Sequence, residues 1–198
     1  MKKLIAILLT ILICGIFSIS SAEAPLRVQP GDSGTEWRIK SKTADGTTTS
    51  GSEQFYSSYT ANRAGERHTI TVTQKYTASI TGQFGVSIGS IEASVGFDHG
   101  EEFTVSASTT SASLSAGETV EVYWQKKFQK YTIQQEQIHW EVVNVGTDNQ
   151  PILKLVEEVI ATKNAYAYKP VAPKIRLEYY NTNARGQRVL TRVETINE

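Results

Sequence analysis

The feature that most constrains the fold of this 198-residue chain is an alternation of apolar and polar residues running from Ile70 to Ile88. Odd positions of this run carry mainly Thr, Ser, Lys and Gln. Successive side chains of a β-strand point to opposite faces, so period two predicts strand with one apolar and one wet face. The even positions, mostly apolar or small, are Ile70, Val72, Gln74, Tyr76, Ala78, Ile80, Gly82, Phe84, Val86 and Ile88.

The parity of the alternation changes at Gly89-Ser90, after which Ile91, Ala93, Val95 and Phe97 share one face. A short break containing glycine between two alternating runs predicts a hairpin turn. A polar turn at 98–102, a Ser/Thr/Ala tract at 103–115 and a further alternating strand at 119–125 follow. We therefore expect one long amphipathic hairpin module within residues 69–125.

The rest of the chain also favours β-structure. Further strands are expected at 36–40, 128–133, 138–145, 152–160, 175–180 and 189–196, and the last two flank a hairpin loop at 181–186. The stretch Ser41–Glu53 consists mostly of Ser, Thr and Gly with almost nothing apolar, which predicts a mobile loop. The fold class expected is all-β and mostly antiparallel.

The N-terminus has the three parts of a secretory signal peptide: basic Lys2 and Lys3, an apolar run over 4–17, and small residues ending at Ala22. We expect cleavage near Ala22 and export from the cell. Cys14, the chain's one cysteine, follows bulky Ile13 and is interpreted as part of the apolar run rather than as a lipid-attachment site. The expected organisation is a signal peptide at 1–22, an N-terminal arm, short strand and loop at 23–68, and an antiparallel β domain at 69–198.

Charge and motifs argue against two classes of partner. Without Lys2 and Lys3, the 20 basic residues fall to 18 against 20 acidic ones, and no basic stripe is present to neutralise phosphates. We expect no nucleic-acid partner and no cofactor.

One catalytic motif matches literally, because Gly85-Val86-Ser87-Ile88-Gly89 has the spacing of a nucleophile elbow. That motif needs a sharp strand-to-helix turn over a parallel sheet, whereas this run is expected to be β-structure with no helix after it. His68, His99 and His139 have no metal-ligand spacing. The sequence therefore predicts neither catalytic residues nor a metal site, and we do not expect an enzyme.

A group of aromatic residues precedes the alternating run: Trp37, Phe55, Tyr56 and Tyr59. Two interpretations are open at this point. The group is either a platform for a glycan or protein receptor, or a small hydrophobic core that closes one end of the sheet.

Several segments resemble the aerolysin-like β-pore-forming toxins of the epsilon-toxin and mosquitocidal-toxin group: 69–73, 82–87, 92–97, the Ser/Thr tract 106–115, and 117–122. The resemblance implies an elongated antiparallel sheet or β-sandwich with a long amphipathic hairpin that unfolds outward. In that family such hairpins from several copies build an oligomeric pore, with the target membrane and other copies as partners. The residues then expected to face lipid are Ile80, Phe84, Val86, Ile88, Ile91, Ala93, Val95 and Phe97.

A second functional hypothesis stays open beside this one. The same pattern would suit a soluble, secreted β-sandwich whose apolar faces are all buried. Such a protein would bind a glycan, the cell wall or a protein ligand without forming a pore.

Overall fold

The computed structural model describes residues 29–147 and 150–197. The described residues form two compact units, the smaller made of residues 29–32, 142–147 and 150–155 and the larger of residues 33–141 and 156–197. The predicted signal peptide and its cleavage site near Ala22 lie outside the described residues. No helix in the described part of the chain is both long and apolar enough to cross a membrane.

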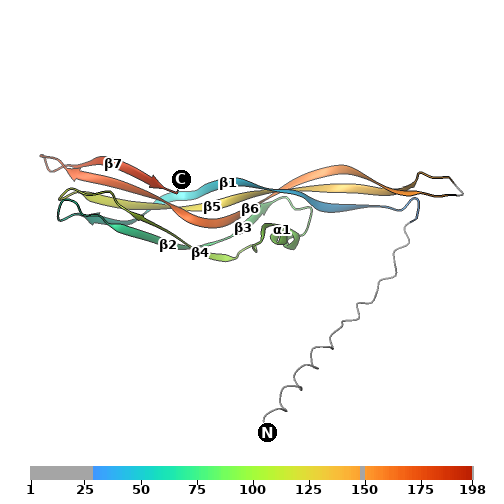
Figure 1. Cartoon of the computed structure of the whole chain (residues 1–198), viewed down its shortest axis with the longest axis horizontal. Helices are drawn as coiled ribbons and strands as arrows, with labels where there is room; N and C mark the ends of the chain where they lie inside the picture. Colours follow the sequence, from blue (N-terminus) through green and yellow to red (C-terminus); the bar gives the residue numbers. More distant parts are fainter. Residues whose placement is uncertain (1–28, 148–149, 198) are drawn as a thin grey trace, which may run out of the picture. The chain divides into compact units, whose positions relative to one another are not determined.

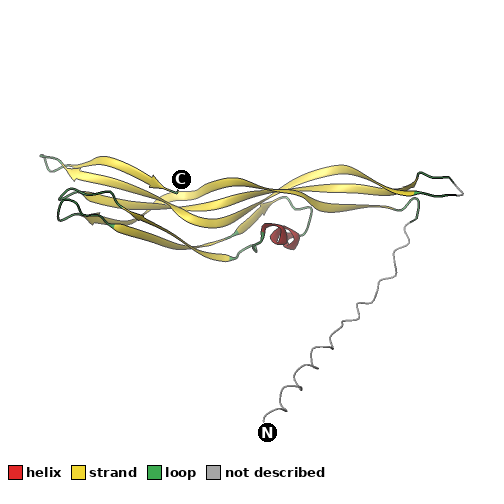
Figure 2. Cartoon of the chain, in the orientation of Figure 1, coloured by secondary structure: helices red, strands yellow, loops and turns green. Residues whose placement is uncertain are grey.

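The prediction of an all-β antiparallel fold is confirmed (Figure 2). The main sheet has the order β1-β5-β6-β3, and β7 also pairs with β6. Three of its strands are unusually long: β1 (Ser33–Thr60), β5 (Thr119–Asn144) and β6 (Leu153–Thr182), against a usual length of about 5–6 residues. The shorter ones are β3 (Ser79–Gly82) and β7 (Arg188–Ile196) (Figure 1).

The predicted mobile loop at Ser41–Glu53 was wrong, since this stretch is the middle of β1. It pairs with β5, for example Thr43 with Thr132, and Gln129 Nε2 donates to Gly46 O at 2.8 Å. Register shifts around its glycines leave Gly46 at a φ of 91°, a left-handed conformation that favours glycine. A strand exposed along most of this length has no apolar face for periodicity to detect.

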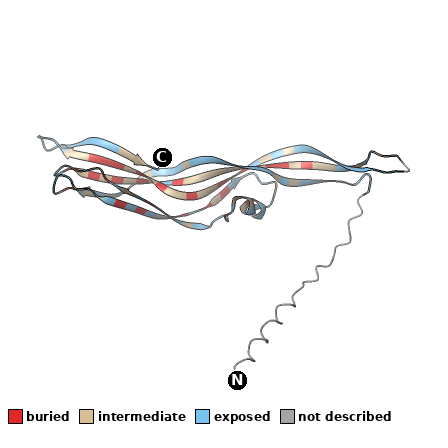
Figure 3. Cartoon of the chain, viewed as in Figure 1, coloured by how far each residue is buried: buried red, intermediate tan, exposed pale blue. Residues whose placement is uncertain are grey.

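A second, two-stranded sheet consists of β2 (Thr69–Thr77) and β4 (Glu102–Thr110), which are antiparallel with Thr69 opposite Thr110. The predicted alternation holds here, because Ile70, Val72 and Tyr76 are buried while the odd-numbered threonines are exposed. These buried residues belong to a core shared with β5 and β6 (Figure 3).

The predicted hairpin turn at Gly89-Ser90 and the strand over 91–97 were wrong. Residues 78–101 instead hold strand β3, which joins the main sheet, and helix α1 (Ile88–Val95). Ser87 caps the helix, its Oγ accepting from Ser90 N at 3.1 Å, and Gly96 ends it in the left-handed conformation with its N–H donating to Glu92 O. Both caps could have been found in the sequence.

The smaller unit is held by backbone and Asn contacts. Gly31 N donates to Val142 O and Val142 N to Asp32 O, each at 2.8 Å. Asn144 Oδ1 accepts from Ile152 N at 3.1 Å and so closes the turn between β5 and β6. Val145 and Ile152 are exposed in this unit.

Candidate functional site: the hairpin layer and its insert

We call β2 and β4 the hairpin layer and residues 78–101 the insert. The exposed face of the hairpin layer is a ladder of hydroxyl groups. The Oγ1 atoms of Thr69 and Thr110 lie 3.0 Å apart, as do Thr71 Oγ1 and Ser108 Oγ. Lys75 Nζ lies 2.9 Å from Glu102 Oε1 at the end of the ladder. These three side-chain contacts lie within the layer and join β2 to β4.

The inner face of the hairpin layer is apolar and packs on the main sheet. Val72 is fully buried in one cluster with Val122 of β5 and Leu177 of β6. The two sheets share no hydrogen-bonded ladder among the described strands. One side-chain bond links β1 to the layer, with Tyr56 Oη donating to Thr71 O at 3.0 Å. Apolar contact therefore supplies most of the attachment.

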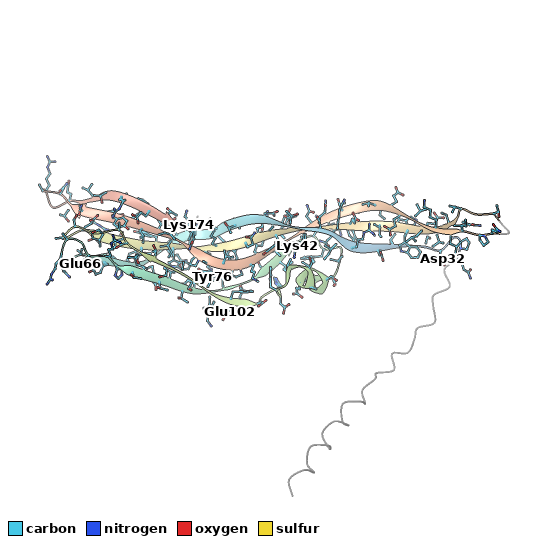
Figure 4. All side chains as sticks on the ribbon, viewed as in Figure 1. Asp32, Lys42, Glu66, Tyr76, Glu102 and Lys174 are labelled. Carbon is cyan, nitrogen blue, oxygen red and sulfur yellow. The ribbon has the colours of Figure 1, made fainter. Side chains whose placement is uncertain are left out.

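Tyr76 lies near the end of β2, on the side of the hairpin layer that packs on the main sheet (Figure 4). Its ring packs near Trp124 and Phe128, with centroids 6.1 and 6.0 Å apart. Among the described residues its buried hydroxyl has no hydrogen-bond partner. Burial raises the pKa of Tyr76 to about 12. An unpartnered buried hydroxyl weakens the attachment of the layer, because its lost hydration is not replaced.

The insert is held differently, by a buried amide on β5. Gln135 is fully buried, and its Oε1 accepts from Gly85 N at 2.7 Å and Val86 N at 3.0 Å. Its Nε2 donates to Gln83 O at 3.0 Å. The ring of Trp37 covers Gly85 so closely that a Cβ there would lie 2.2 Å from it. This glycine is needed for close approach.

Helix α1 fills a second core beneath the main sheet. Ile91 is fully buried beside Ile133, and Phe97 packs near Tyr131 at 6.2 Å between ring centroids. Ser94 O accepts from Lys42 Nζ of β1 at 2.7 Å. His99 Nδ1 accepts from Ile80 N at 3.0 Å. The insert is thus held by buried apolar side chains and by individual hydrogen bonds.

The residues expected to face lipid do not share one face in this structure. Ile80, Ile91 and Phe97 are buried in the second core. Val86 and Val95 are partly buried against it. Exposed positions are Phe84, Ile88 and Ala93. Their expected role in a membrane-bound state stays a prediction.

The structure does not bring the four predicted aromatics together. Trp37 pairs with Gln137, whereas Phe55 pairs with Tyr123 much further along β5. Tyr56 reaches the hairpin layer, as described above. Tyr59 stacks on His68 at 4.5 Å, and its hydroxyl donates to Glu66 Oε2 at 2.6 Å, which holds the pKa of Glu66 below its ordinary value.

A cluster that the sequence did not predict surrounds Phe55 on the outer face of the main sheet. Phe55 is 57% exposed and meets Tyr123 edge-on at 5.8 Å. The guanidinium of Arg176 lies 4.9 Å from the Tyr123 ring and pairs with Glu53 at 2.6 Å. A hydrogen bond to Glu121 is the main cause that raises the pKa of Tyr123 to about 12. The alternation of buried and exposed residues along β5 and β6, taken together, could have revealed that Tyr123 and Arg176 share the outer face of the sheet.

The expectation that no helix follows Ser87 was wrong, because Ser87 is the cap of α1. The sheet beside it is nevertheless antiparallel, with β3 antiparallel to β6. Within the described residues, the Ser87 side chain bonds to Ser90 alone, with the two Oγ atoms 2.8 Å apart. A serine nucleophile is activated by a general base within hydrogen-bond reach of its hydroxyl, the position that Ser90 takes beside Ser87. In the described segments, no group of three or more His, Cys, Asp or Glu side chains is arranged to hold a metal ion.

Comparison with known proteins adds little to this geometry. The chain matches no protein-family model and no curated protein sequence. Among solved structures it is similar to parasporin-2, a Bacillus thuringiensis toxin that recognizes cancer cells. The similarity covers 84% of this chain and 74% of the toxin chain, at 13% identity and a TM-score of 0.20. Values this low carry no argument about activity.

Proposed function

We propose that this protein is secreted and acts on membranes, by releasing its insert and hairpin layer and joining them with those of other copies in a β-structured pore. The single observation that carries the proposal is the hairpin layer itself. Hydroxyl groups on its exposed face pair with one another within the layer, and its other face is apolar. In the described residues, no backbone hydrogen-bonded pairing joins the layer to the main sheet.

The dimensions of the layer support the proposal. β2 and β4 each have nine residues, and a tilted strand needs about 9–11 residues to cross a bilayer. One face must meet lipid and the other water, which the Ile70–Tyr76 side and the threonine side would supply. Closure into a barrel needs several copies, because a single hairpin leaves unpaired edges in lipid.

The test uses calcein-loaded vesicles of phosphatidylcholine and cholesterol, zwitterionic lipids chosen because the chain without Lys2 and Lys3 is slightly acidic. We expect dye release together with oligomers that survive SDS. Val72→Asp places a charge on the proposed lipid face and should abolish release, while Thr71→Asn on the hydroxyl face should retain it. A chain that stays monomeric and releases no dye would contradict the proposal.

A binding module without pore formation is the second candidate, and the cluster around Phe55 favours it. An exposed aromatic ring beside Arg and Tyr is typical of protein-binding surfaces. Phe55→Ala should then weaken binding to a captured ligand severalfold without changing dye release. Tyr56→Phe, which removes the bond to Thr71, serves as the control for indirect effects on the layer.

A further inference from the structure

Strand β6 has an open edge between Val156 and Lys163. On the side away from β5, β3 pairs with residues 165–168 and β7 with residues 175–182. Asn164 O still accepts from Gln83 N at 3.1 Å. Before that point, no strand among the described residues pairs with this side of β6.

The backbone groups at this edge can be assigned from the strand geometry. Since Asn164 O points to the free side, the alternation of an extended strand points the N–H and C=O groups of Thr162, Ile160 and Glu158 the same way. Unpaired groups in a row form a template for a further strand. The free edge therefore offers a ready ladder rather than a single contact.

Exposed apolar side chains alternate with charged ones along this edge. Val156, Val159 and Ile160 are 44%, 49% and 50% exposed, and the two valines lie on opposite faces of the strand. Natural edge strands are usually protected by charges, proline or bulges. The charged residues along this edge, Glu157, Glu158 and Lys163, are of both signs, and Arg38 Nη1 binds one carboxylate oxygen of Glu157, Oε2, at 2.8 Å.

The charges at this edge are self-complementary. In an antiparallel pair of two copies with the two-fold axis at Ile160, Glu157 of one copy faces Lys163 of the other. Val159 then faces Ala161, and Glu158 faces Thr162. Opposite charges and apolar pairs directly across a ladder are both stabilising. Within its own copy Glu157 binds Arg38 and Lys163 Nζ lies 4.8 Å from the centre of the Trp37 ring, and the opposite signs of Glu157 and Lys163 across the ladder favour a second copy as the partner.

We propose that two copies of this chain pair edge to edge along Glu157–Lys163, antiparallel and centred on Ile160. The contact is an isologous one, in which each residue meets its symmetry mate. It is short and so falls below the roughly 1,200 Å² typical of stable complexes. We therefore expect a weak, concentration-dependent dimer that covalent capture will reveal. This dimer is independent of the proposed pore.

The test is a disulfide at the two-fold axis, in the chain beginning at Glu23, which contains no other cysteine. Ile160→Cys places two thiols across one pair, about 5.5 Å apart between Cα atoms, which suits a disulfide. Val156→Cys is the matched control: it is similarly exposed and on the same face of β6, but in this register it lies eight positions from its own mate. Both variants are oxidised with glutathione and separated on non-reducing gels.

We expect the Ile160→Cys variant to form severalfold more disulfide dimer than the Val156→Cys variant. Adding Thr162→Pro to Ile160→Cys removes an N–H from the free edge but none from the ladder to β5, so it should abolish the excess. Equal dimer from the two single variants, or a dimer insensitive to Thr162→Pro, would overturn the proposal. No membrane is present, so the outcome is separate from the test of pore formation.

Discussion

Two buried tyrosines show how differently the main sheet and the hairpin layer are held. Tyr179 of β6 is fully buried, and its hydroxyl accepts from Ala112 N at 3.0 Å and donates to Glu194 Oε2 at 2.8 Å. Tyr76 of β2 is also buried, yet its hydroxyl has no partner among the described residues. Around Tyr179 the main sheet combines packing with satisfied polar groups, whereas around Tyr76 the layer relies on packing and leaves a polar group unsatisfied.

The insert lies between these extremes. Four residue pairs join β3 to β6, and Gln135 adds three hydrogen bonds from a fully buried position. Hydrophobic contact has no preferred direction, whereas hydrogen bonds do. The hydrogen bonds of the insert therefore fix its position on the main sheet more precisely than apolar contact fixes the layer. If the layer and insert leave the main sheet together, the seat of the insert controls when they do so.

The largest effect is expected for Ile91→Ala, which empties a fully buried site under α1. We expect a loss of about 2–5 kcal/mol in the free energy of unfolding, from lost burial plus the cavity left behind. Ala93→Ser on the exposed side of the same helix is the control and should change it by less than about 0.5 kcal/mol. Urea denaturation of both variants decides, and equal midpoints would show that α1 is not seated as described.

A smaller effect is expected for Gln135→Leu, which keeps the side chain buried but removes the partners of the Gly85 and Val86 N–H groups. Leaving buried donors unpaired costs about 1–3 kcal/mol. Hydrogen exchange at these two amides should accelerate, while amides of the β1–β5 ladder should not change. Gln134→Leu, one residue away and on the other face of β5, should leave both measurements unaltered.

The smallest effect compares the two tyrosines directly. Tyr179→Phe leaves Ala112 N–H without its partner and should lower the free energy of unfolding by about 1 kcal/mol. Tyr76→Phe removes a hydroxyl that has no partner in the described part of the chain, so stability should stay the same or rise slightly. Thermal melts of the pair measure the difference. A loss for Tyr76→Phe as large as that for Tyr179→Phe would remove the contrast between the two regions.

Part of this fold could be predicted from the sequence. The alternation from Ile70 to Tyr76 identified strand β2 with its one wet face, and the alternating strand predicted at 119–125 lies within β5, where Val120, Val122 and Trp124 share one buried face. The prediction failed at α1, because the spacing of Ile91 and Val95 suits a helix as well as a strand and the caps at Ser87 and Gly96 decide between them.

The seat of the insert could not be predicted. Gln135 lies on a strand whose buried positions change parity, from even numbers at Val120 and Val122 to odd ones at Ile133 and Gln135. The β1–β5 pairing has register shifts along this stretch, two of them at Gly46 and Gly51 of β1, but the sequence of β5 itself carries no mark of them. A buried amide chosen by its distant partners, Gly85 and Val86, is visible only once the sheets are assembled.

We expect that the insert must detach from the main sheet before the protein can permeabilise a membrane. A reversible engineered disulfide, used as a lock, tests this. Ile80 N donates to His99 Nδ1, away from β6, so Ile80 and Ala167 form a non-hydrogen-bonded pair, with Cα atoms about 4.5 Å apart and within reach of a disulfide. Thr60→Cys with Thr119→Cys is the control lock inside the main sheet, where the two hydroxyls lie 2.8 Å apart.

The measurement is calcein release by Ile80→Cys with Ala167→Cys, oxidised and then reduced, in the chain beginning at Glu23. We predict almost no release while the disulfide is closed, recovery when it is reduced, and release by the control lock in both states. Release by the oxidised Ile80–Ala167 lock equal to that of the control would contradict the claim that the insert detaches.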